Sequence, residues 1–298
     1  MKRTRVWLMG VAVMLGWVNL TASQDRPKPS RLPQGVQVLR DLQYVEDGHE
    51  RNRLDLYLPE EAQSPLPVIV WIHGGAWQAG SKENCPAVTL VAKGYAVASV
   101  NYRLSQHAVF PAQIEDCKAA IRWLRANAAK YHLDPNHVGV WGVSAGGHLV
   151  AMLGTSGSVN ELNGQGGNLD QSSRVQCVVD WFGPSDLAIM AGAHNNPGSP
   201  ESRLIGGAIQ EHLEQARKAS PLTYVSKDSA PFLIMHGDKD NLVPVGQSEA
   251  LAEALKKAGV EVKLQIVTDN GHGGPGFASP ANRQLVEDFF AKHLREDK

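Results

Sequence analysis

The stretch that decides the fold is Val138-Gly139-Val140-Trp141-Gly142-Val143-Ser144-Ala145-Gly146-Gly147. Its first half is an apolar run typical of a buried strand, and residues 145–153 have the spacing of a helix. Between them lies Gly142-Val143-Ser144-Ala145-Gly146. Glycines on both sides of a serine permit a sharp turn in which neighbouring backbone passes too close for a Cβ. The segment therefore predicts a strand, a tight turn that carries Ser144, and a helix.

Strand-like and helical patterns alternate on both sides of this segment. Residues 53–58 alternate apolar and polar, as in a half-buried strand, and residues 68–72 are continuously apolar, as in a strand covered on both faces. Further strand-like runs lie at 96–100, 138–143, 175–179, 232–235 and 262–267, and helical patterns at 87–93, 111–130, 145–153, 247–257 and 280–294. This rhythm predicts an α/β fold with a mostly parallel, doubly wound sheet and an antiparallel edge.

Residues 184–225 interrupt that rhythm. Short helical pieces are separated there by Pro197, Pro200 and Pro221, where one crossover helix would suffice. Ligands of open α/β sheets bind beyond the carboxyl ends of the strands. We therefore expect a small cap insertion at about 184–225 that overhangs such a site; the alternative is a surface excursion without a function.

The N-terminus has the pattern of an export signal. Lys2, Arg3 and Arg5 precede an acid-free apolar run over 6–20, and small residues follow at 21–23. We predict a signal peptide at 1–23, a Pro-rich and charged linker at 24–35, an ordered domain at 36–298, and export to the periplasm or the medium. Fifteen helical residues span about 22 Å, less than the ~30 Å hydrocarbon layer, so no stable membrane span is expected.

Composition excludes other classes of protein. Lys plus Arg total 29 against 30 for Asp plus Glu, so no nucleic-acid partner is expected. No Cys/His grouping has metal-ligand spacing, so neither a metal nor another cofactor is predicted. Cys117 and Cys177 lie in apolar patterns and are expected to be buried thiols, whereas Cys85 could pair with Cys117 in an oxidising compartment.

If Ser144 is a nucleophile, it needs an imidazole to take its proton and an acid to orient that imidazole. His272, in the flexible loop Asn270-Gly271-His272-Gly273-Gly274, is the predicted base. The predicted acid is Asp240, because it lies further out in the loop after a strand than Asp238, which looks like a turn former beside a glycine. Asp180 is a third candidate.

His73-Gly74-Gly75-Ala76-Trp77 follows the buried strand at 68–72. Glycines at such a position let backbone N–H groups turn towards a developing oxyanion. Gly75, Ala76 and Ala145 are the predicted donors. Trp77 and Trp181 both lie just past strand ends and are expected either to form aromatic walls of a substrate site or to pack beneath the cap.

At these residues the chain resembles the α/β-hydrolase superfamily, and specifically esterases that join H-G-G-x-W to G-x-S-A-G-G and H-G-D-x-D-x-x-V-P. Segments 101–104 and 199–207 resemble secreted bacterial acetylxylan and feruloyl esterases. Ala76 departs from the glycine of hormone-sensitive-lipase-like enzymes. The resemblance implies an α/β-hydrolase domain over 36–298, a Ser-His-Asp esterase, and a small-molecule or polysaccharide-linked ester substrate, such as acetyl or feruloyl esters of plant polysaccharide.

Three other functions remain open at this point. Arylformamidases, which are C–N hydrolases of the same fold, also carry H-G-G-x-W, although their substrate is cytoplasmic and this chain has an export signal. A non-catalytic binding module on this scaffold typically lacks one of the three reactive side chains, and this chain has all three candidates. A prolyl-type peptidase usually brings a propeller domain, for which 298 residues leave no room.

Overall fold

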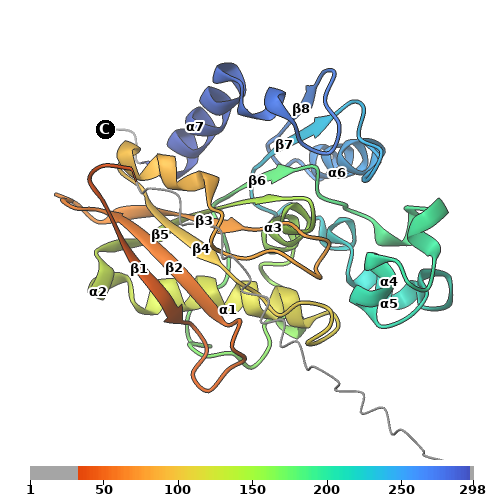
Figure 1. The fold of residues 1–298 in the computed structure, drawn as a ribbon, viewed down its shortest axis with the longest axis horizontal. Helices are drawn as coiled ribbons and strands as arrows, with labels where there is room; N and C mark the ends of the chain where they lie inside the picture. The colour runs from red at the N-terminus through yellow and green to blue at the C-terminus, as the bar shows by residue number, and fades with distance from the viewer. Residues whose placement is uncertain (1–32, 296–298) are drawn as a thin grey trace, which may run out of the picture. The chain divides into compact units, whose positions relative to one another are not determined.

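The computed structural model describes residues 33–295, and within them the strands form one eight-stranded sheet in the order β1-β2-β4-β3-β5-β6-β7-β8 (Figure 1). β2 pairs antiparallel with both β1 and β4, and the remaining pairs are parallel. The strands are β1 (Val36–Gln43), β2 (Arg53–Pro59), β3 (Leu66–Ile72), β4 (Ala96–Val100), β5 (Leu133–Val143), β6 (Cys177–Trp181), β7 (Phe232–Gly237) and β8 (Val262–Val267).

Helices cover both faces of the sheet. On one face lie α1 (Ala112–Ala126), α2 (Ala128–Tyr131), α3 (Ala145–Thr155) and α6 (Gly246–Lys257). On the other face lie the 3-10 helix η1 (Pro86–Lys93), η7 (Pro275–Ala278) and α7 (Pro280–Leu294). Alternate residues of β3 enter the two cores, Val70 on the α3 side and Trp71 on the α7 side, because successive side chains of a strand point to opposite faces. Central strands buried on both faces explain the continuous apolar runs of the sequence.

Between β6 and β7 the chain builds a cluster of short helices, which we call the cap (residues 184–225). It contains η3 (Leu187–Ile189), η4 (Gly192–Asn195), α4 (Pro200–Ile205), η5 (Ile209–Glu211), α5 (Leu213–Lys218) and η6 (Pro221–Tyr224); one further 3-10 turn, η2 (Asn160–Leu162), precedes β6. The entry and exit of the cap are joined, because the Leu222 N–H donates to the Ser185 carbonyl and the Leu187 N–H to the Ser220 hydroxyl. Figure 1 shows α4 and α5 beyond the end of the sheet.

The predicted fold class is confirmed, and the boundaries differ in identifiable ways. The helix expected over 111–130 is divided at Asn127, and the one over 87–93 is a 3-10 helix that begins at a proline. The strand expected at 175–179 runs two residues later, as β6, and β1 was not predicted. The signal peptide at 1–23 and most of the linker at 24–35 lie outside the described residues. Within 33–295, no helix has the length and apolar character that crossing a membrane requires.

The possible disulfide between Cys85 and Cys117 is wrong. Both thiols are free, as is that of Cys177. Cys117 lies in the core on the α3 side of the sheet, whereas Cys85 packs against the core on the α7 side. The sheet itself separates the two sulfur atoms, which sequence spacing could not reveal.

Candidate active site

Three side chains that are far apart in the sequence form one hydrogen-bonded chain. The Ser144 Oγ lies 2.7 Å from the His272 Nε2, and the His272 Nδ1 lies 2.7 Å from the Asp240 Oδ2. Ser144 follows β5, Asp240 follows β7 and His272 follows β8. Because the carboxyl ends of parallel strands meet at one edge of a sheet, these loops converge there. This is the spatial arrangement of a nucleophile, a base and an orienting acid.

Ser144 adopts a strained backbone conformation, with φ 55° and ψ −121°. Such strain needs close neighbours, and glycines supply the space for them. A Cβ at Gly146 would collide with the Ile72 and His73 carbonyls, and one at Gly142 would collide with the Gly146 carbonyl. The glycines on both sides of the serine thus let β3, β5 and α3 approach closely enough to hold the turn.

The loops that carry Asp240 and His272 are bound to each other. The Lys239 N–H donates to the Asn270 carbonyl at 2.9 Å. A Cβ at Gly237 would collide with the Asn270 and Gly271 carbonyls, so a glycine is required where the loops cross. The ring of Phe182 packs against that of His272, with centroids 4.6 Å apart. Asp240 and His272 are therefore held as one unit.

Asp240 is stabilised as a carboxylate. Burial of its side chain raises its pKa, but hydrogen bonds from His236, His272 and the Val243 and Leu242 N–H groups outweigh burial and hold the pKa well below its usual value. Those N–H groups donate to Oδ1 at 2.9 and 2.8 Å. The fully buried His236 brings its Nε2 within 3.2 Å of Oδ2 and 2.9 Å of the Val243 carbonyl.

An ionised Asp240 fixes the tautomer of His272. A carboxylate only accepts hydrogen bonds, so the His272 Nδ1 carries the proton and donates it to Oδ2. The Nε2 of the neutral ring is then an acceptor for the Ser144 hydroxyl. The site is poised for transfer of the serine proton to His272.

Neither of the other two candidate acids contacts His272. Asp238 is exposed. Asp180 is fully buried and its Oδ1 accepts from the Gly183 N–H at 3.0 Å, while burial raises the pKa of its carboxyl to about 6. The structure therefore brings Asp240, not Asp238 or Asp180, to the imidazole.

The loop after β3 approaches the serine turn directly. A Cβ at Gly74 would lie 2.9 Å from the Val143 carbonyl oxygen and 3.3 Å from the Ser144 Cβ. Among the described residues, neither the Ala76 N–H nor the Ala145 N–H donates a hydrogen bond, and both residues line a cavity beside Ser144. Gly75 has φ 112° and its carbonyl accepts from two N–H groups of the turn, but the residue does not line the cavity. Of the three expected oxyanion donors, Ala76 and Ala145 have the better placement.

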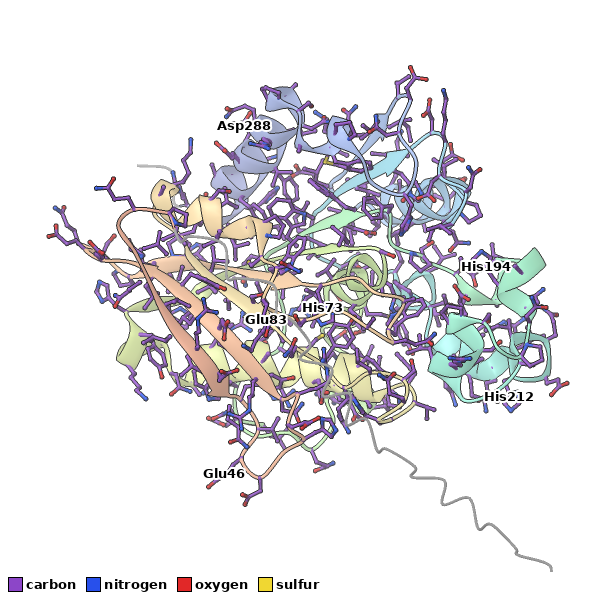
Figure 2. The ribbon with its side chains drawn as sticks, viewed as in Figure 1. Glu46, His73, Glu83, His194, His212 and Asp288 are labelled. Atoms are coloured by element: carbon purple, nitrogen blue, oxygen red, sulfur yellow. The ribbon has the colours of Figure 1, made fainter. Side chains whose placement is uncertain are left out.

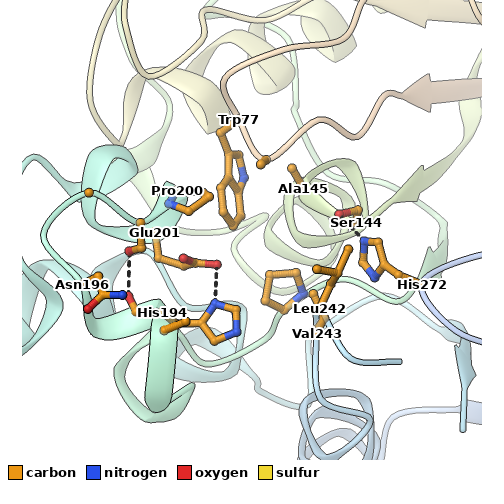
Figure 3. Close-up of a pocket in the computed structure, with 15 residues that line it drawn as sticks. Trp77, Ser144, Ala145, His194, Asn196, Pro200, Glu201, Leu242, Val243 and His272 are labelled. Atoms are coloured by element: carbon orange, nitrogen blue, oxygen red, sulfur yellow. Dashed lines mark hydrogen bonds and ion pairs between the residues drawn. The ribbon is translucent and has the colours of Figure 1, made fainter. Parts of the chain in front are cut away.

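The edge of the sheet that carries Ser144, Asp240 and His272 is called the catalytic edge below. The cavity has a volume of about 510 Å³ and lies between this edge and the cap. Figure 3 shows Ser144 and His272 on one side and cap residues on the other. Its walls are mainly apolar, and they are formed by Ala76, Trp77, Ala145, Pro184, Ala193, Pro200, Leu242 and Val243 together with polar cap residues. A mainly apolar cavity with few polar groups is typical of a small-molecule site.

The two tryptophans expected near the substrate have different positions. Trp77 lines the cavity, although it is only 2% exposed. Trp181 does not line it: the ring packs against Trp141 and Phe277 on the α7 side of the sheet. As an aromatic wall, Trp181 is therefore a wrong prediction. Its neighbour Asp180 points to the opposite face, and this alternation along β6 turns the indole away from the cap.

His148 connects the loop after β3 to the cap. The Trp77 indole N–H donates to the His148 Nδ1 at 3.2 Å, so the ring is protonated at Nε2, which donates to the Ala219 carbonyl at 2.6 Å. Burial lowers the pKa of His148 to about 4. This neutral histidine is a structural bridge behind the cavity.

Sequence reasoning missed the cap side chains in the cavity, above all His194 and Glu201. The prolines of this region marked the insertion, but no periodicity showed which residues turn inwards. No group of three or more His, Cys, Asp or Glu residues with the geometry of a metal site occurs between residues 33 and 295.

Comparison with known proteins places this geometry in a family. A family model described as BD-FAE matches residues 54–255. The chain belongs to the BD-FAE family. The match covers β2 to α6, including the serine turn and the loop of Asp240, whereas His272 lies beyond its end.

Two solved structures similar to this BD-FAE chain have names that describe ester hydrolysis. A truncated form of a carbohydrate esterase from gut microbiota is 38% identical, with a TM-score of 0.81, and the match covers 87% of this chain and 97% of that one. An acetyl ester-xyloside bifunctional hydrolase from Caldicellulosiruptor lactoaceticus is 29% identical, with a TM-score of 0.68, over 80% of this chain and 87% of that one.

Curated relatives are longer than this chain. Esterase LipQ of Mycobacterium tuberculosis is 31% identical over 261 residues, which are 85% of this chain and 61% of that protein. Esterase LipC of the same organism is 32% identical, with 83% of this chain and 64% of that protein covered. The chain thus spans about three-fifths of the length of these relatives.

Proposed function

We propose that this protein hydrolyses carboxylic esters by two-step acyl transfer through Ser144, His272 and Asp240. The observation that carries the proposal is the chain of two 2.7 Å hydrogen bonds from the serine to the imidazole and from the imidazole to the carboxylate, beside an apolar cavity. Membership of the BD-FAE family and similarity to proteins named as esterases support it.

The first step forms an acyl-enzyme. The Ser144 oxygen attacks the ester carbonyl carbon while the His272 Nε2 takes the hydroxyl proton. Asp240 stabilises the resulting imidazolium without taking a proton itself. The Ala76 and Ala145 N–H groups, with Gly75 as a further candidate, donate to the oxyanion. The alcohol then leaves with the proton held by His272.

The second step returns the enzyme to its starting state. Water enters the place of the alcohol, and His272 takes one of its protons as the oxygen attacks the acyl carbon. The tetrahedral intermediate collapses, the carboxylic acid leaves, and the proton returns to the Ser144 oxygen. Overall, one ester and one water molecule are consumed, and no group of the chain is changed.

We propose acetyl or feruloyl esters of plant polysaccharide as the substrate class. The support comes from similar proteins named for carbohydrate ester chemistry. The basic and apolar N-terminal segment, residues 1–23, supports export to the compartment where such polymers are found.

A substrate panel tests the proposal. Wild type and Ser144→Ala are compared on acetyl, butyryl, long-chain, feruloyl and N-formyl substrates, with the exposed Ser158→Ala as the matched control. We expect ester hydrolysis by wild type and by Ser158→Ala, and loss of roughly a million-fold in kcat for Ser144→Ala. A preference for the N-formyl substrate would contradict the ester assignment. Full activity of Ser144→Ala would contradict the assignment of Ser144 as the nucleophile.

A further inference from the structure

Two polar cap residues, His194 and Glu201, form a pair inside the cavity of Ser144. His194 belongs to η4 and Glu201 to the first turn of α4, and the His194 Nδ1 lies 3.0 Å from the Glu201 Oε1. Figure 2 shows His194 on the cap, and Figure 3 shows the pair on the cavity wall opposite Ser144 and His272. The proposed hydrolysis uses neither side chain.

The carboxylate of Glu201 has unused hydrogen-bonding capacity. The residue is only 5% exposed, and its Oε2 is buried without a hydrogen-bond partner among the described residues. A buried acceptor without a partner costs free energy, so each one calls for an explanation. The terminal torsion of a glutamate is broad, so a partial rotation turns this buried acceptor towards the cavity that Glu201 lines.

The pair selects for hydrogen-bond donors. A carboxylate only accepts hydrogen bonds, so the His194 Nδ1 donates to Glu201, and the remaining capacity of the carboxylate is for a further donor. The nearby wall of Trp77 is apolar, whereas Asn196 and Ser199 of the cap also line the cavity. A ligand group that contacts the carboxylate of Glu201 itself must bring a donor.

The pair is held in place by the local structure of the cap. The Ser199 hydroxyl donates to the His194 carbonyl at 2.7 Å and accepts from the Ser202 N–H at the start of α4. The Ser202 hydroxyl donates to the Asn196 carbonyl at 2.8 Å. These bonds join η4 to α4, so His194 and Glu201 are positioned before a ligand arrives.

We propose that Glu201, oriented by His194, is a specificity residue that accepts a hydrogen bond from a hydroxyl group on the alcohol part of the ester. This inference rests on the proposed ester hydrolysis at Ser144 and deepens it. The favoured substrates are esters of polyhydroxylated alcohols, such as sugars that carry one acetyl group and free hydroxyls. The few polar groups of a mainly apolar site commonly set its orientation and specificity in this way.

The experiment compares substrates that differ only in their donors. Methyl xyloside monoacetate offers free hydroxyls, its O-methylated counterpart offers none, and 4-nitrophenyl acetate measures acyl transfer without a sugar. Acetylcholine tests whether a cation, rather than a hydroxyl, is what the carboxylate takes. The readout is the ratio of kcat/KM for the free-hydroxyl sugar to kcat/KM for 4-nitrophenyl acetate.

Glu201→Gln replaces the acceptor-only carboxylate with an amide of the same shape. We expect this ratio to fall roughly 10- to 100-fold, as for loss of a hydrogen bond to a charged group. Glu211→Gln, an exposed glutamate of the cap outside the cavity, should keep the wild-type ratio. His194→Phe, which keeps a ring but releases Glu201, should lower the ratio about 3- to 10-fold and gives a second test if Glu201→Gln folds poorly.

The outcomes separate this inference from the proposed function. If wild type hydrolyses 4-nitrophenyl acetate but treats the free and O-methylated sugars alike, the hydroxyl assignment fails and ester hydrolysis stands. If Glu201→Gln lowers both rates equally, the residue is structural and the inference fails. If wild type prefers acetylcholine to the sugar acetate and Glu201→Gln loses that preference, Glu201 binds a cation and the assignment of a hydroxyl partner is wrong. Inactivity of wild type on every ester would instead contradict the proposed function.

Discussion

The catalytic edge of the sheet and the cap border the same cavity but are built differently. At the catalytic edge, Ser144 and Asp240 follow buried strands and His272 follows the half-buried edge strand β8, and close approaches at Gly142, Gly146 and Gly237 hold the loops. In the cap, helices of six residues or fewer, too short to be stable alone, are joined by bonds between side chains and backbone. The difference teaches that the proposed reaction depends on the sheet, whereas the choice of substrate can change with the cap.

Gln247, at the start of α6, is one of the residues that anchor the cap. The Gln247 Oε1 of α6 accepts from the Ser185 and Asp186 N–H groups at 2.8 and 2.7 Å, and its carbonyl accepts from the Ser185 hydroxyl. All these groups are on loops or helix ends and not on strands. The position of the cap therefore depends partly on the helices beside the sheet, whereas the position of Ser144 depends on the end of β5.

The largest effect that tests this comparison is expected at the catalytic edge, with Asp240→Asn. Asparagine keeps the shape but cannot hold His272 in the tautomer that accepts the serine proton, so kcat should fall about ten-thousand-fold. Asp238→Asn, at an exposed position two residues earlier, should retain wild-type kcat. Rates on 4-nitrophenyl acetate measure both, and equal losses in the two variants would contradict the assignment of the acid.

A smaller free-energy change is expected when one methyl group is added to a glycine at the catalytic edge or in the cap. The quantity measured is the free energy of unfolding in urea. Gly146→Ala places a Cβ against the Ile72 and His73 carbonyls, and should destabilise the protein by about 3 kcal/mol. Gly198→Ala in the cap meets no atom within 4 Å and should change stability by less than about 0.5 kcal/mol. Similar losses in both variants would show that the cap is packed as tightly as the catalytic edge.

The bridge between the two regions predicts a pH effect on stability. Burial lowers the pKa of His148 from 6.5 to about 4. The unfolded chain therefore takes the proton first as the pH falls, so the stability contributed by the neutral ring is complete above pH 6.5 and is lost between pH 6.5 and 4. The loss is roughly 3 kcal/mol. Buried His73, with its pKa also lowered to about 4, acts in the same direction, and Asp180, with its pKa raised to about 6, acts in the opposite one.

His148→Gln isolates that contribution, because a glutamine amide can accept from Trp77 and donate to the Ala219 carbonyl without titrating. Urea unfolding at pH 7 and pH 4 should show about 3 kcal/mol less acid destabilisation in this variant than in wild type. Equal differences in wild type and His148→Gln would exclude the histidine as the source.

The sheet could be predicted because its central strands are runs of apolar residues, which are typical of strands buried on both faces. Residues 68–72 and 96–100 are apolar at every position or nearly so, and the structure buries them on both faces. β1 escaped prediction because it is an edge strand with a mixed burial pattern, whose pairing with β2 is interrupted by a bulge. Its stability comes from its partner and not from its own residues.

The candidate site divides in the same way. Ser144, Asp240 and His272 could be found because each lies a few residues after a strand, and chain topology carries such positions to one edge. Trp181 also lies at the end of a strand, but its ring points away from the cavity. The predicted strand ended two residues before β6 does, so the sequence did not show which face of the sheet Trp181 occupies. Glu201 lies in the segment 199–207 that carries the family resemblance, but the sequence did not show that it faces the cavity, because that depends on where a short helix docks.

The sequence alone determined the order of strands and helices and which polar residues reach the carboxyl edge, since apolar runs and glycine-flanked turns are local properties of the chain. Only the tertiary structure decided which atoms meet: the 2.7 Å contacts of His272, the separation of Cys85 from Cys117, and the position opposite Ser144 of Glu201, whose Oε2 has no partner among the described residues. The physical reason is that contact distances depend on how loops and helices pack against one another, and packing is a property of the whole molecule rather than of any segment.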